Sequence, residues 1–341
     1  MKAKFSRAHH GQRQAAAALL CLLVAGVLLV RPASSTIPAL SPNGNTPAAD
    51  RWDFTAFPVT WSLNPAANGN VPGASALPGL IQTAFNTWTS APNAALAVGR
   101  GPNSSATSGG FDPQSSSNIN LICFVCQGDF SKDAETLAVT ITTIENSPGG
   151  PDGHGGRTRF VGQILDADIL FNPNDQFSTG GGGNGQDLLT VATHEIGHFL
   201  GLDHSGVVRA VMFPFAPTVL TTLSYDDVAG ISALYPKPSP DVPTGTISGA
   251  VHMGSGSPVF GAHVFAESQT SALPFGGSIR KSPISAMTAP DGAYTISGLP
   301  ADSYIVVAEP LDGPVSDSDV ESFPKAFHQS AVQTGFTTRW H

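Results

Sequence analysis

The sequence predicts an α+β domain followed by an all-β sandwich, and two changes of pattern along the chain lead to this prediction. Strand-like apolar runs precede a histidine-rich segment with helical spacing, and a proline-rich stretch then leads into short β-like runs separated by glycine and proline turns. A length of 341 residues suggests two domains, and 41% hydrophobic content suffices for packed cores. The formal net charge of −9, with only 12% charged residues, excludes a basic face for nucleic acid.

The first 35 residues have the pattern of a signal peptide. Basic residues precede a largely apolar run over 15–30, and the small residues at 33–35 suit a cleavage site. An uncleaved membrane anchor is the alternative, but the 16 residues of the run are fewer than the ~20 that a spanning helix needs. We therefore expect a secreted, extracellular protein that begins near Thr36, with a linker over 36–49 and no stable membrane association.

Residues 50–236 are predicted to form one domain in which the sheet comes first and the active helix after it. The segment 77–90 carries apolar residues at helical spacing. Strands are expected at 57–63, 118–124, 136–142 and 166–172. A glycine run at 179–186 then leads into a helix from about Asp187.

The stretch THEIGHFLGLDHS, which starts at residue 193, crowds three histidines and one glutamate together. His194 and His198 are four residues apart, so on a helix their imidazoles stand on one face. Zinc prefers nitrogen and sulfur ligands in a tetrahedron, and a catalytic zinc keeps three protein ligands and a water. The pair therefore predicts two of the three ligands of a catalytic zinc.

The same stretch also supplies a third ligand and a base. Gly201 can adopt the left-handed conformation that ends a helix, and the resulting turn would bring His204 to the metal. Glu195 lies about 100° round the helix from His194, so it stays free of the metal. It can act as general base on a water whose pKa zinc lowers to about 7.

Five positions here match the pattern H-E-x-x-H-x-x-G-x-x-H, and Met212 follows in AVMFP. The run HEIGHFLGLDHSGVVRAVMFP resembles the matrixins, the metzincin family of matrix metalloproteinases and their bacterial relatives. LSYDDVAGISALYP, at 223–236, resembles the helix that closes a matrixin catalytic domain. The resemblance implies a metzincin fold, a mixed twisted sheet with an active-site helix. It also implies one catalytic zinc, with Gly201 and Met212 as structural support.

The resemblance further implies where a protein or peptide substrate binds. The strand at 136–142 occupies the place of the matrixin edge strand, against which a substrate lies extended. The main specificity pocket lies beside the zinc helix, and Ala216 stands where the family usually has a tyrosine, so the pocket preference is open. The implied substrate-binding residues are Leu137, Ala138, Val139, Thr190, Pro214 and Phe215.

The chain departs from vertebrate matrixins at their structural zinc. Gln127, Val139 and Asp168 stand where that site has histidines, and Asp129 alone remains. A second zinc is not expected, because carboxylates and carbonyls suit calcium rather than zinc. Calcium ligands and ordinary surface carboxylates are both open for Asp129, Asp133, Asp166 and Asp168.

The cysteines bear on redox state and on latency. Cys123 and Cys126 fit either a small disulfide or two buried free thiols. Between Thr36 and Asp50 there is no cysteine, so a cysteine switch that caps the zinc is not expected.

A proline-rich linker at 237–244 precedes a region, 245–312, that resembles the transthyretin-like β-sandwich found beside carboxypeptidases. Residues 313–341 are unplaced. Because all expected ligands precede the linker, the C-terminal part is expected to be dispensable for the chemistry. The sequence thus predicts a secreted zinc endopeptidase of unknown oligomeric state. The alternative is a non-catalytic surface or matrix-binding protein with a protease scaffold, which would not need Glu195 beside intact ligands.

Overall fold

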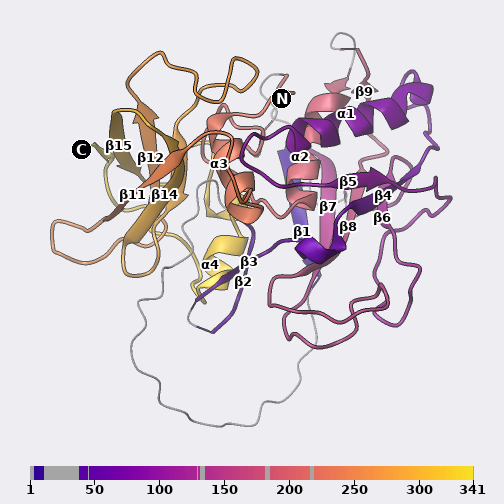
Figure 1. Ribbon diagram of the computed structural model, residues 1–341, viewed down its shortest axis with the longest axis horizontal. Helices are drawn as coiled ribbons and strands as arrows, with labels where there is room; N and C mark the ends of the chain where they lie inside the picture. The colour runs from indigo at the N-terminus through magenta and orange to yellow at the C-terminus, as the bar shows by residue number, and fades with distance from the viewer. Residues whose placement is uncertain are drawn as a thin grey trace.

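The computed structural model describes residues 4–10, 38–44, 46–128, 130, 135–180, 185–215 and 219–340. Figure 1 shows two halves, with a large sheet and two helices in one half and most of the later strands in the other. The helices are α1 (Leu77–Thr89), α2 (Leu188–Phe199), α3 (Tyr225–Leu234) and α4 (Ser322–Ala326), and the short 3-10 turns are η1 (Phe54–Ala56), η2 (Ala74–Ala76) and η3 (Asp317–Asp319).

The large sheet is mixed, with strand order β1-β7-β8-β6-β4-β5. β7 runs antiparallel to β8, whereas the other neighbouring pairs are parallel. The strands are β1 (Lys4–His10), β4 (Val59–Asn64), β5 (Val98–Arg100), β6 (Asn120–Cys123), β7 (Thr136–Ile144) and β8 (Ile164–Phe171). The strands and helices expected in this half therefore all form, with shifts of a few residues at their ends.

Aromatic side chains hold α1 and α2 against the sheet. Trp61 of β4 stacks on Phe85 of α1, and Phe85 meets Phe199 of α2 edge to face, both with ring centroids 5.3 Å apart. Trp88 is fully buried, and its indole N–H donates to the Thr193 carbonyl over 2.7 Å. Each buried aromatic of this kind contributes about 1.5–3 kcal/mol by leaving water. The packing fixes the helix that carries the histidines.

The strand β7 is not outermost in the sheet, because β1 pairs with it from Lys4 opposite Thr136 to His10 opposite Thr143. The expected exposed edge at 136–142 is thus covered by the chain's own N-terminal strand, which satisfies the backbone groups along β7. Loss of the first 35 residues, as the predicted signal implies, would return β7 to the edge. The apolar run 15–30 and its cleavage site lie outside the described residues. Among the helices that the structure describes, none is long and apolar enough to cross a membrane.

Cys123 and Cys126 form a disulfide, with their Cα atoms 5.6 Å apart. The strand β6 ends at Cys123 and the chain bends at Phe124 and Val125, which brings the two sulfur atoms onto the same side. Of the two alternatives that the sequence left open, the structure has the disulfide.

The C-terminal half contains two sheets, β11-β14 and β13-β12-β15-β16. Buried side chains from both sheets belong to the same hydrophobic core as α2 and α3. Gly298 of β14 lies so close to α3 that a Cβ there would be 2.8 Å from the Cβ of Ala229. The strands are β11 (Thr244–Ala250), β12 (His263–Ser268), β13 (Ile284–Met287), β14 (Ala293–Pro300), β15 (Tyr304–Glu309) and β16 (Arg339–Trp340). The sequence did not predict β13 or α4.

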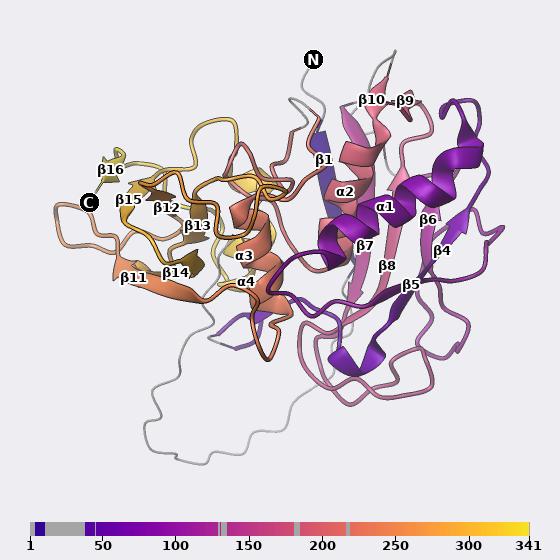
Figure 2. The same cartoon turned by 45° about the horizontal axis from the view of Figure 1, so that its top comes forward.

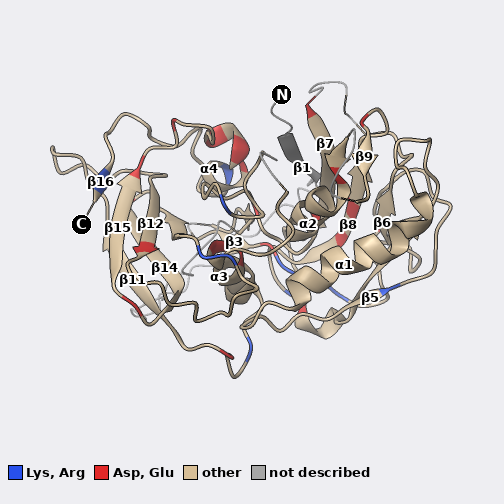
Figure 3. Cartoon of the chain, turned by 90° about the horizontal axis from the view of Figure 1, so that it is seen from above, with Lys and Arg blue, Asp and Glu red and all other residues tan. Residues whose placement is uncertain are grey.

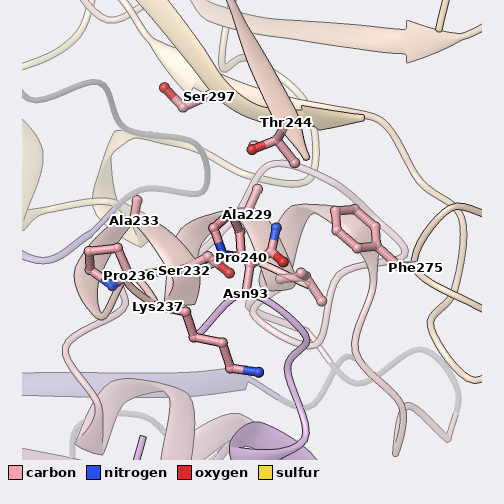
Figure 4. A pocket seen from close by; sticks show the side chains of 12 residues that line it. Asn93, Ala229, Ser232, Ala233, Pro236, Lys237, Pro240, Thr244, Phe275 and Ser297 are labelled. Carbon is pink, nitrogen blue, oxygen red and sulfur yellow. The ribbon is translucent and has the colours of Figure 1, made fainter. Parts of the chain in front are cut away.

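Short pairings and a cavity complete the fold. A cavity of about 220 Å³ lies where α3 meets the linker and β14. Figure 4 shows the side chains that line it, among them Ser232, Lys237, Phe275 and Ser297. Figure 3 shows Lys and Arg spread over both halves of the ribbon rather than gathered on one element.

The remaining strands form two small pairs, β2 (Leu40–Ser41) with β3 (Ala48–Ala49) and β9 (Phe177–Ser178) with β10 (Gln186–Asp187).

Candidate metal centre and active site

Helix α2 presents the first two histidines, and the sequence fixes both of its ends. The Asp187 carboxylate caps the start by accepting from the Thr190 N–H over 2.8 Å. Past the end, Gly201 has φ 97°, and a Cβ at this position would be 2.1 Å from the Asp50 carbonyl oxygen. Only glycine fits both this left-handed backbone and this close approach. The turn returns the chain so that His204 faces the helix, as expected.

The ligand nitrogens of His194, His198 and His204 all lie within 4.8 Å of one another, and the three side chains are buried. Within the part of the chain that the structure describes, one group of three or more His, Cys, Asp or Glu residues could hold a metal ion, and it is this one. The structure therefore brings together the three histidines that the sequence singled out, and metal binding by them stays a prediction.

Each imidazole has its Nδ1 next to a backbone carbonyl. The distances are 2.7 Å from His194 to Val211, 2.8 Å from His198 to Leu202, and 2.5 Å from His204 to Asp319. A carbonyl only accepts, so Nδ1 carries the hydrogen in each ring. In a neutral ring of this tautomer, Nε2 carries the lone pair that a metal binds.

The donor set fits a metal such as zinc. Nε2 of His194 is 3.1 Å from Nε2 of His198, and two lone pairs at this distance repel unless they share a cation. A tetrahedral zinc with Zn–N of about 2.0–2.1 Å holds two nitrogens roughly 3.3 Å apart. Burial lowers the pKa of His194 well below its usual value, and the neighbouring His204 acts in the same direction. The ring is therefore in the neutral form that ligates metals.

Glu195 lies beside this cluster and is fully buried. The Thr140 hydroxyl of β7 is 2.6 Å from Glu195 Oε2 and 3.1 Å from the Glu195 carbonyl oxygen. Burial raises the pKa of Glu195 to about 8, and the hydrogen bond from Thr140 lowers it. The other oxygen, Oε1, is buried and accepts no hydrogen bond from the described residues. Thr140 thus holds one carboxylate oxygen and leaves the other for a reactant.

Met212, the expected Met-turn residue, packs against helix α2. It is fully buried, and a Cβ added to Gly197 of α2 would be 2.2 Å from its sulfur atom. The buried Asp227 of α3 accepts from the Val211 N–H over 2.8 Å and from the Met212 N–H over 3.2 Å. The same carboxylate closes a capping box with Ser224 at the start of α3. One aspartate therefore joins the closing helix to the turn under the metal centre.

The expected substrate-binding residues are mostly buried. Leu137, Ala138 and Val139 are buried on β7, and Thr190 is buried on α2 with its hydroxyl accepting from the Leu220 N–H over 3.1 Å. Pro214 is buried, and Phe215 is half-buried beside Phe213, at a ring distance of 5.8 Å. Ala216 lies outside the described residues.

The acidic residues considered for calcium include a buried pair. Asp166 and Asp168 of β8 are each 1% exposed, and Asp168 accepts from the backbone N–H groups of Leu121 and Gly110, both over 2.7 Å. Burial raises the pKa of Asp166, and the neighbouring Asp168 raises it further. These two are not surface carboxylates. Asp129 and Asp133 lie outside the described residues, so calcium stays a prediction.

Comparison with known proteins agrees with this geometry. Residues 144–236 match the matrixin family model. The chain is 40% identical over 98 residues to stromelysin-3 of Xenopus laevis, covering 28% of this chain and 20% of that protein. It is 41% identical over 91 residues to matrilysin of Rattus norvegicus, covering 26% and 34%. It is 46% identical over 56 residues to karilysin of Tannerella forsythia, covering 16% and 12%. The chain thus spans at most about a third of these three relatives.

The matched residues begin at the end of β7 and finish just after α3, so they contain the three histidines, Glu195 and the methionine turn. Both the family and the relatives support a zinc metalloendopeptidase. Residues 144–236 are thus similar to a matrixin domain.

Proposed function

We propose that the chain is a secreted zinc-dependent endopeptidase that hydrolyses peptide bonds in protein substrates. The proposal rests chiefly on one observation, the convergence of three buried imidazoles beside the buried carboxylate of Glu195. A scaffold without catalytic activity would not need this carboxylate, which would cost about 1–3 kcal/mol or more to bury without full pairing.

In this proposal His194, His198 and His204 hold the zinc through their Nε2 atoms. The metal, when bound, lowers the pKa of water to about 7 and polarises the scissile carbonyl. Glu195 Oε1 takes the proton from the attacking water and passes it to the leaving amine nitrogen. The Thr140 hydroxyl fixes Oε2 meanwhile, so that the carboxylate does not rotate away from the reacting atoms.

The substrate is proposed to lie extended along β7, near Leu137, Ala138 and Val139, by strand addition. The pairing of β1 with β7 supports this, because an extended segment of the chain itself pairs with the outer side of β7. Main-chain pairing of this kind binds many sequences, so selectivity would come from pockets near Thr190 and Phe215. Removal of the N-terminal segment on export would make the strand accessible.

Residues 245–312 are proposed to form a transthyretin-like β-sandwich with an accessory role. The proposal is supported by Val264 and Ala266 of one sheet and Ile296 and Leu299 of the other, which are buried in the same core.

The experiment is digestion of casein and of a short quenched fluorescent peptide by the purified exported protein. We expect cleavage that stops with a chelator and returns when zinc is added. Cleavage that continues at the same rate in excess chelator, with metal analysis confirming zinc-free protein, would reject the proposal.

A further inference from the structure

The third histidine of the metal cluster is oriented from a distant part of the chain. The carbonyls that face His194 and His198 come from Val211 and Leu202, 17 and 4 residues away. The carbonyl that faces His204 Nδ1 belongs to Asp319, 115 residues away, at 2.5 Å. The orientation of this ligand therefore depends on a segment of the C-terminal tail.

The position of the Asp319 carbonyl is fixed by a tight local turn. Asp319 is 4% exposed, and its carboxylate accepts from the Ser316 N–H over 2.9 Å and from the Ser316 hydroxyl over 3.0 Å. The Asp319 N–H donates back to the Ser316 carbonyl over 3.0 Å. Three hydrogen bonds between two residues thus close η3 and set the direction of the carbonyl.

A second link ties the same segment to the metal loop. The Ser322 hydroxyl donates to Asp203 Oδ2, and Asp203 Oδ1 accepts from the backbone N–H of His204 over 2.8 Å. Asp203 and Ser322 are both buried. His204 is consequently held at its ring by Asp319 and at its backbone by Asp203, whose carboxylate is in turn held by Ser322.

Apolar packing anchors this segment between the two halves of the molecule. Val320 is fully buried and Phe323 is 5% exposed. Phe323 stacks on Phe260 with ring centroids 5.5 Å apart, in a cluster that also contains Phe213, the residue after Met212. Figures 1, 2 and 3 place α4 between the C-terminal strands and the half that carries α2. Removing this segment would expose the apolar side chains that pack against it, among them Phe260.

We propose that the segment 316–323 is an integral part of the metal centre, in which the Asp319 carbonyl positions His204 and the Ser322–Asp203 bond holds its loop. The inference rests on the proposed zinc site. It reverses the expectation from sequence that the C-terminal part is dispensable, because truncation at Pro236 would remove both contacts. Partners that orient metal-ligating histidines are worth about 10- to 100-fold in metal affinity.

The test measures the zinc dissociation constant of the full chain by competition with a chromogenic chelator. Ser322→Ala and Asp319→Ala should each weaken zinc binding by about 10- to 100-fold. Ser322→Thr and Asp319→Asn keep the hydroxyl and the acceptor oxygen, so they should restore most of the affinity. Ser330→Ala is the matched control, because this serine is exposed on the same tail. The cobalt-substituted protein should show an altered visible spectrum in the alanine variants only, since the spectrum reports the ligand field.

Two results would overturn the inference. One is zinc affinity in both alanine variants within about twofold of wild type, well below the 10-fold effect expected of an orienting partner. The other is unchanged affinity with faster peptide cleavage, which would make the segment a removable cover. Val320→Asp, which places a charge at a fully buried position and should detach the segment, should weaken zinc binding at least as much as either alanine variant. A wild-type chain that binds no zinc would instead reject the proposed function itself.

Discussion

Thr140→Val tests whether the residue that holds the proposed general base matters for turnover. The change keeps the shape of the side chain and removes the hydroxyl that lies 2.6 Å from Glu195 Oε2. A hydrogen bond to a charged group is worth about 1.5–3 kcal/mol, and each 1.36 kcal/mol is tenfold in rate. If the bond persists in the transition state, kcat/KM should fall by roughly 10- to 150-fold.

The assay is steady-state cleavage of a short fluorogenic peptide by zinc-loaded protein, with zinc content measured on the same samples. Thr140 is not a ligand, so the variant should keep its zinc while it loses rate, and Thr140→Ser should recover most of the rate. Thr136→Val on the same strand is the matched control, because Thr136 is also buried. A Thr140→Val enzyme within about twofold of wild type, far from the tenfold minimum, would refute the positioning role.

Three further predictions follow from buried contacts. Gly197→Ala should lower the free energy of unfolding by about 1–3 kcal/mol in denaturant titrations, because the added methyl meets the Met212 sulfur at 2.2 Å. This loss should exceed the gain from the better helix propensity of alanine, and unchanged stability would contradict the prediction. Asp227→Ala should lower the free energy of unfolding by about 3 kcal/mol or more and also weaken zinc binding, since several buried N–H groups lose their acceptor. A loss of less than about 1 kcal/mol would contradict this prediction. The third prediction concerns pH. The raised pKa of Asp166 means that the folded state favours the protonated form of this carboxyl group. Wild-type stability is therefore lost as the pH rises above the pKa of Asp166 in the unfolded chain, about 4. Asp166→Asn should therefore gain melting temperature relative to wild type between pH 5 and 8 in calcium-free buffer, and parallel melting curves would count against it.

Local sequence patterns were sufficient to predict the first half of the fold and the metal cluster. The apolar spacing in α1 and α2 follows the 3.6-residue period, and the left-handed requirement at Gly201 is a property of one residue type. The placement of His194 and His198 on one face of α2 follows from helix geometry alone, because residues four apart share a face. These features depend on neighbours within a few residues, which is the range over which sequence patterns predict well.

The parts that the sequence did not predict depend on contacts between distant residues. Thr140 sits in a strand with several threonines, and nothing in TLAVTIT distinguishes the one whose hydroxyl reaches Glu195. Asp319 orients His204 through its backbone carbonyl, which every residue possesses, so no residue type marks the contact. The pairing of β1 with β7 uses main-chain groups as well. Neither the spacing of apolar residues nor a sequence motif indicates such long-range partners.

The comparison of Glu195→Ala with His198→Ala tests the central claim most directly, with zinc content and peptide turnover measured on the same purified samples. Glu195→Ala should keep about one zinc per chain, because the three imidazoles remain, and should lose about 10²- to 10⁴-fold in turnover, because the proton acceptor is gone. His198→Ala should lose the metal itself. A Glu195→Ala protein that cleaves peptide at the wild-type rate, or a wild-type protein that holds less than about half an equivalent of zinc after zinc-replete expression, would contradict the proposed mechanism.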